Sequence, residues 1–139
     1  MIIAIRIRGL VGVKIGVAET FDRIRLRRKF SCVLVNEKDV VMMGMLNKLK
    51  DGVAYGAVDE KTLTELIKAR GTMKDKTEIK DPASVAKELM GGKKLEDLGL
   101  KPFFRLHPPR KGINSKLHYP RGVIGDNKEK INDLVMRML

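Results

Sequence analysis

The first 58 residues contain three apolar runs that are typical of strands. Residues 2–8 alternate strictly, with isoleucine at every second position from Ile3, while the opposite side ends in Arg6 and Arg8. A period of two predicts a strand with one buried face. Residues 30–35 and 53–58 predict a second and a third strand. The first of these is apolar on both faces, which suits the centre of a sheet.

Between and beyond these runs, apolar residues recur every three to four positions, which predicts helices. Asp39, Asp59 and Asp126 stand where N-cap residues are expected, and Pro82 suits a first helical turn. The predicted helices cover residues 17 to about 26, the stretch from Asp39 to Leu49, residues 59–71, residues 81–91, one further turn at residues 95–100, and a final helix from Asp126 to Met138.

The order of these elements predicts an α+β fold. We expect residues 1–71 to form a β-α-β-α-β core with a helix after it. Residues 72–139 are expected to form an extension with short helices, a basic proline loop at residues 102–122 and a C-terminal helix that packs on the core. The alternation of strands and helices by itself favours parallel strand pairing.

The net charge of +12 is concentrated in two stretches of the chain. Residues 1–30 and residues 101–122 each carry +6, and the remainder is neutral. The proline loop contains both histidines and no acidic residue, and the Pro108–Pro109 pair excludes a helix there. Such a segment is too polar to form a core of its own, so we expect it to lie against a polyanion.

RNA is the polyanion that this pattern favours. Lys and Arg displace the counterions of phosphates, and His and aromatic rings stack on bases. A membrane surface is the competing anion, but the basic stretches lack an amphipathic helix with a large apolar face. On charge and position alone, the candidate RNA-binding residues are Lys14, Arg23, Arg27, Arg28, Lys29, Lys116, His118 and Arg121.

Several other kinds of chemistry are excluded. Cys32 is the single cysteine, so the chain holds no internal disulfide or thiol–metal cluster, and its apolar neighbours suit a buried side chain. The glycines at positions 9, 12 and 16 lack the spacing of a phosphate-binding loop. No apolar run is long enough for a signal peptide or a membrane span. We therefore expect a cytoplasmic protein without metal, cofactor or small-molecule substrate.

Four segments resemble one known family. They are IRIRG at residues 5–9, GMLNKLKDGVAYG at 44–56, FRLHPPRKG at 104–112 and NDLVMRM at 132–138. The chain resembles, over essentially its full length, the large-subunit ribosomal proteins called L-thirty in bacteria and archaea and L-seven in eukaryotes. The RLHPPR run and the extension after Gly71 are similar to the archaeal and eukaryotic branch.

This resemblance implies an antiparallel three-stranded sheet covered by helices on one face. It implies a structural role in the large ribosomal subunit and binding to 23S-type ribosomal RNA. It implies that 5S RNA and other ribosomal proteins lie nearby, and that the chain has no catalytic activity. The residues that match the family's basic motifs are Arg6, Arg8, Asn47, Lys48, Arg105, His107, Arg110 and Lys111. The family commonly has an arginine where this chain has Met43, which puts an RNA contact there in doubt.

Two other functions remain open on the residues alone. A small ribonuclease could use His107 and His118 as base and acid, although no carboxylate is near them in the sequence to orient a ring. A basic DNA-binding architectural protein is the second, although the chain has no helix-turn-helix or zinc motif.

Overall fold

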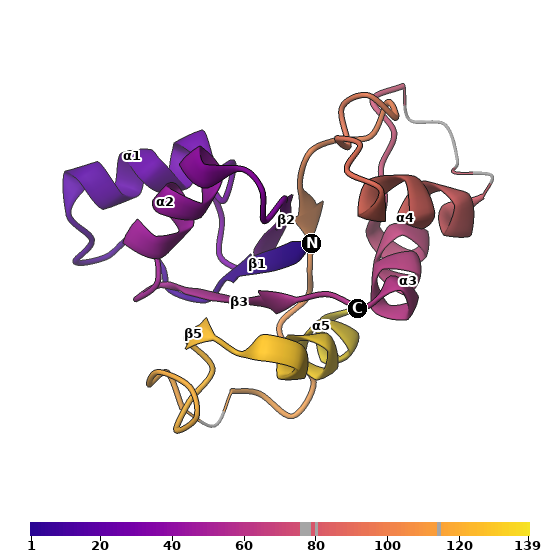
Figure 1. Cartoon of the computed structure of the whole chain (residues 1–139). Helices are drawn as coiled ribbons and strands as arrows, with labels where there is room; N and C mark the ends of the chain where they lie inside the picture. Colours follow the sequence, from indigo (N-terminus) through magenta and orange to yellow (C-terminus); the bar gives the residue numbers. More distant parts are fainter. Residues whose placement is uncertain (76–78, 80, 114) are drawn as a thin grey trace.

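The computed structural model describes residues 1–75, 79, 81–113 and 115–139. Its centre is one sheet of five strands in the order β4-β2-β1-β3-β5 (Figure 1). The three long strands are those predicted from the sequence, and their bounds are Ile2–Arg6 for β1, Ser31–Val35 for β2 and Val53–Ala57 for β3. Strands β4 (Phe104–Arg105) and β5 (Gly125–Asp126) have two residues each and form the edges.

The three long strands pair antiparallel, with Ile5 opposite Cys32 on one side and Arg6 opposite Val53 on the other. The parallel pairing favoured by the alternation of elements is therefore wrong, and the pairing implied by the family resemblance is confirmed. The order of elements does not determine strand direction. After the first helix, the loop at residues 24–30 brings the chain back to the end of the sheet where β1 finished, so β2 starts there and runs antiparallel to β1. Among the named strands of the described residues, the short pair β3–β5 alone is parallel.

Helices α1 (Ile15–Arg23) and α2 (Val40–Lys48) cover one face of the sheet. Phe21 of α1 and Leu46 of α2 pack there against the strand residues Ala4, Val33 and Val53. The Asp39 carboxylate caps α2 as predicted, because its Oδ1 accepts hydrogen bonds from the backbone N–H groups of the second and third residues of the helix, both at 3.1 Å.

The opposite face is covered by the helices that follow β3. They are α3 (Glu60–Arg70), α4 (Pro82–Met90) and α5 (Ile131–Met138), the last of which is preceded by the 3-10 turn η1 (Lys128–Lys130). Ile3, Ile5 and Ile7 of the first segment pack against them. In Figure 1, α1 and α2 lie on one side of the sheet and α5 on the other.

The expectation of a three-stranded sheet covered on one face is therefore incomplete. The segment after residue 71 adds the two edge strands and the second helical layer, and its apolar residues share one core with the isoleucines of β1. As a result β1 is buried on both faces. β1 is the middle strand of the sheet, and β2, which was predicted to be central, lies inside the sheet between β4 and β1.

Residues 95–99 form turns, and Leu100 forms an antiparallel bridge with Met73, in place of the predicted helical turn. Leu95 and Leu100 are buried as their spacing suggested, but Gly99 has a φ of +71°, which is incompatible with a right-handed helix. Within the described part of the chain, no helix is both long and apolar enough to cross a bilayer.

Candidate nucleic-acid interface

The sheet gathers basic segments from distant parts of the sequence at one of its ends. Strands β1 and β4 finish at this end, and β2, β3 and β5 begin there. The backbone N–H of Arg8 donates to Gly52 O (3.1 Å), and that of Phe30, next to Lys29, donates to Arg6 O (2.8 Å). We call this the basic end of the sheet, comprising residues 7–14, 26–30, 47–52, 106–113 and 115–124.

The proline loop connects the two edge strands across this end. It leaves β4 at Leu106, whose N–H donates to Phe30 O (3.0 Å), and re-enters the sheet at β5 beside Ala54. Since β4 and β5 lie at opposite edges, the loop leads from one edge of the sheet to the other (Figure 1, orange to yellow). The two basic stretches, separated by 70 residues in the sequence, thus lie on the same part of the molecule.

The first half of the proline loop is held by the end of α5. The N–H of His107 donates to Met138 O and that of Arg110 to Arg137 O, both at 2.9 Å. The Arg137 guanidinium donates back to Arg110 O through Nε (3.1 Å) and Nη2 (2.9 Å), and to Gly112 O through Nη2 (2.6 Å). These bonds involve backbone carbonyls only, so the side chains of Arg110 and Lys111 stay exposed.

The second half of the loop forms a compact turn against β5. Tyr119 N–H donates to Ile124 O (2.8 Å) and Ile124 N–H to Leu117 O (3.1 Å). A Cβ on Gly122 would overlap the backbone of Leu117, so only glycine fits. His118 Nε2 lies 3.1 Å from Asp51 Oδ1, which connects this turn to the start of β3.

Of the sixteen residues predicted to bind RNA, all except Arg6 are exposed. At the basic end lie Arg8, Lys14, Arg27, Arg28, Lys29, Asn47, Lys48, His107, Arg110, Lys111, Lys116, His118 and Arg121, and Arg105 is the last residue of β4 before it. Arg27 Nε is 3.5 Å from Asp22 Oδ1, and both side chains are largely exposed. Arg23 does not join this group, since it lines a cavity beside β2.

Arg6 is the exception, and its predicted surface role is corrected by the structure. Its side chain is 1% exposed and donates to Leu26 O (2.7 Å), Arg27 O (2.9 Å) and Arg8 O (2.9 Å). Its guanidinium lies 4.1 Å from the centroid of the Phe21 ring. Burial lowers the pKa of Arg6 from its usual value, and Asp22 partly offsets this. Arg6 therefore positions the loop at residues 26–30.

Known proteins resemble the chain along nearly its whole length. A family model described as Ribosomal protein L30p/L7e matches residues 2–53. The large ribosomal subunit protein uL30 of Archaeoglobus fulgidus is 41% identical, with 99% of each chain covered. Those of Methanococcus vannielii and Nanoarchaeum equitans are 39% and 38% identical over 97% and 96% of each chain. The chain belongs to the uL30 family.

The uL30 family is structural, so the prediction that the chain is not an enzyme is confirmed. The structure corrects one premise of the ribonuclease alternative, because a carboxylate, Asp51, does lie beside His118. The Asp51 side chain is 68% exposed, however. The backbone of His107 is bonded to a different element, the end of α5. Among the described residues, no three His, Cys, Asp or Glu side chains are grouped so that they could hold a metal ion.

Two features of this uL30 chain could not be recognised from the sequence. Arg137 lies in the last helix but is not on the face formed by its apolar residues, so the sequence predicts only that its side chain points outward. Its role in holding the proline loop depends on tertiary structure. Met43, where the family commonly has arginine, is half-buried and packs with the cluster beneath α1 and α2.

Proposed function

We propose that this chain is a structural constituent of the large ribosomal subunit in the cytoplasm, and that it binds 23S-type ribosomal RNA through the basic end of its sheet. The observation that carries the proposal is the gathering of both basic stretches at this end, on exposed side chains over a rigid sheet. 5S RNA and neighbouring ribosomal proteins are the further partners that we propose nearby.

The arrangement favours recognition of RNA shape and phosphates over base sequence. The guanidinium groups of Arg8, Arg28 and Arg110 suit bidentate phosphate contacts, and lysines add point charges. The imidazole of His107 is exposed on the proline loop, where it can stack on a base. Helices flank the sheet and leave the basic end to loops, which supports readout of a folded RNA surface and not insertion of a helix into a DNA groove.

Sedimentation of a cell lysate through sucrose gradients at low and at moderate salt tests this function. We expect the chain to migrate with the large subunit in both conditions, as an integral component does. Migration at the top of both gradients would overturn the proposal. A matched lysate that expresses the Arg110→Ala/Lys111→Ala double variant serves as a comparison, since loss of two phosphate contacts should release more of the chain at moderate salt.

A further inference from the structure

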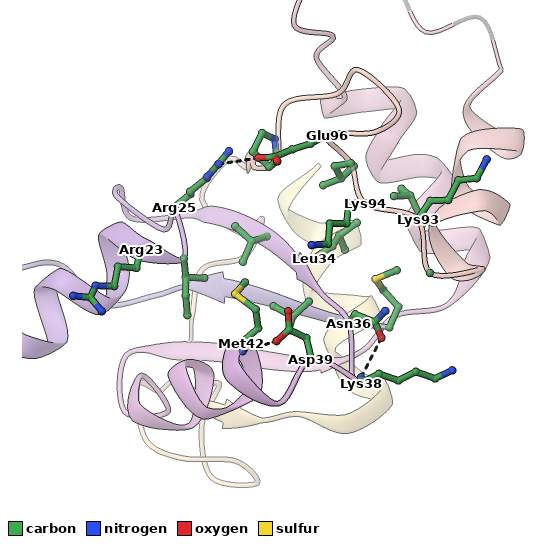
Figure 2. A pocket seen from close by; sticks show the side chains of 18 residues that line it. Arg23, Arg25, Leu34, Asn36, Lys38, Asp39, Met42, Lys93, Lys94 and Glu96 are labelled. Atoms are coloured by element: carbon green, nitrogen blue, oxygen red, sulfur yellow. Dashed lines mark hydrogen bonds and ion pairs between the residues drawn. The ribbon is translucent and has the colours of Figure 1, made fainter.

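A cavity with apolar walls lies away from the basic end, among the described residues. It is a cavity of about 510 Å³ beside β2, bounded by the end of α1, the start of α2 and the connection between α4 and β4 (Figure 2). Val33, Leu34 and Met42 supply apolar surface on one wall, and Leu89 and Leu95 on the opposite wall.

An unpaired edge of the sheet forms one wall of this cavity. Strand β4 pairs only with Ser31 and Cys32, so β2 has no strand neighbour on that side from residue 33 to residue 35. Along a strand, the backbone N–H and C=O groups of successive residues point alternately to one neighbouring strand and to the other. Phe30 O points toward β4, because it accepts a hydrogen bond from the N–H of Leu106. Leu34 lies four residues further on, so its N–H and C=O point to the same side, toward the cavity. An open strand edge is a template for one more strand.

The charge around the cavity is mostly positive and partly unpaired. Its acidic lining residues are already used, since Asp39 caps α2 and Glu96 lies 2.8 Å from Arg25. The Arg25–Glu96 pair joins the end of α1 to the opposite wall, so the cavity is formed before anything binds. In Figure 2 the Lys94 side chain points toward Leu34, while the nearby Glu96 carboxylate is paired with Arg25.

We infer that this cavity is a docking site for an extended, acidic segment of a partner protein, which adds to β2 as a short strand. The edge at Leu34 supplies backbone hydrogen bonds, the apolar walls take alternate side chains, and Lys94 pairs with a carboxylate. RNA fits less well, because no aromatic or histidine side chain stands among the residues that line the cavity, and base stacking needs one. The inference does not depend on RNA binding at the basic end.

The test is an NMR titration of the ¹⁵N-labelled full chain with a synthetic heptapeptide that alternates aspartate with valine. We expect the largest shifts at the amide of Leu34 and at residues 92–96. The same peptide with its central valine N-methylated, and a version with lysine for aspartate, should bind at least about fivefold more weakly. Two variants test the contribution of the Lys94 charge. Lys94→Glu should weaken peptide binding by a similar factor. Lys93→Glu should leave peptide binding unchanged, because the Lys93 ammonium is already paired with Glu88 at 3.0 Å.

Three results would overturn the inference. They are the absence of shifts at Leu34, equal binding of the N-methylated peptide, and equal or stronger perturbation of the same amides by a heptameric oligouridylate. Failure of the proposed ribosomal function is distinguishable, because it would appear as loss of sedimentation with the large subunit while the peptide still bound. In the reverse case the chain would still sediment with the large subunit, while the peptide would produce no shift at the amide of Leu34.

Discussion

Arg6 and Phe21 form a buried cation–π pair, with the guanidinium carbon 4.1 Å from the ring centroid. The pair lies at the last residue of the central strand, directly beneath the basic end. The same guanidinium donates to the carbonyls of Leu26 and Arg27, which begin the loop that carries Arg28 and Lys29. A buried cation thus holds the backbone of a segment whose exposed cations are proposed to contact RNA.

Replacement of Arg6 by alanine should therefore reduce stability. The change leaves buried carbonyls unpaired and removes the contact with Phe21, which together should lower the free energy of unfolding by about 2–4 kcal/mol. Chemical denaturation monitored by circular dichroism measures this. Arg8→Ala is the matched control, because that exposed side chain should change stability by less than about 0.5 kcal/mol. Equal midpoints for the two variants would contradict the role given to Arg6.

The position of Arg6 also shows where sequence patterns stop being informative. Strict alternation correctly predicts that Arg6 shares a face with Ala4, and periodicity places helices α1 to α4 within a few residues of their observed bounds. Whether that face is covered depends on how α1 and α2 pack, which alternation does not specify. An arginine at the end of a strand is usually exposed, so the charge pattern assigned Arg6 to the surface.

The same limit applies to the basic end. Composition located the two basic stretches, but their meeting depends on the antiparallel register of β1, β2 and β3 and on the pairing of two-residue edge strands. A strand as short as Gly125–Asp126 carries almost no local strand signal. Tertiary contacts decide its pairing, so the convergence of charge could not be predicted from spacing alone.

The double variant Arg110→Ala/Lys111→Ala should weaken RNA binding without loss of stability. Each exposed cation that contacts a phosphate contributes close to one unit to the slope of log affinity against log salt, so the slope should fall by up to about 2. Alanine keeps a Cβ at residue 111, where φ is +65°, so the backbone strain is unchanged. Filter binding to 23S-type RNA between low and moderate salt measures the slope.

The control for this double variant is Lys61→Ala/Lys68→Ala, which removes the same charge from exposed positions of α3. We expect it to change the slope far less, since Lys61 and Lys68 are not among the residues of the basic end. A similar fall in slope for both double variants would mean that only net charge matters. A lower melting temperature for the Arg110→Ala/Lys111→Ala variant, with the slope intact, would indicate a structural role.

Replacement of Arg137 by lysine should separate loop positioning from charge. Lysine keeps the positive charge but cannot bond both Arg110 O and Gly112 O through a planar fork. We expect faster amide hydrogen exchange in the proline loop and affinity for RNA lower by roughly threefold to tenfold, because more of the loop must be ordered on binding. The salt slope should stay constant. Unchanged exchange rates with an altered slope would instead make Arg137 a direct phosphate contact.

Alkaline titration of Tyr55 tests the pairing of β3 with the short edge strand β5. Burial raises the pKa of Tyr55, and the neighbouring carboxylate of Asp126, its register partner, raises it further. Because the folded pKa lies above the unfolded value, the stability that the neutral phenol contributes is fully present below about pH 10 and is lost as the pH rises through the folded pKa.

Absorbance at 295 nm in a Tyr119→Phe background follows this one phenol. Asp126→Asn should move the transition part of the way back toward the ordinary value, since burial is the larger cause and remains. An unchanged transition in the asparagine variant would show that β5 does not stay paired with β3 in solution.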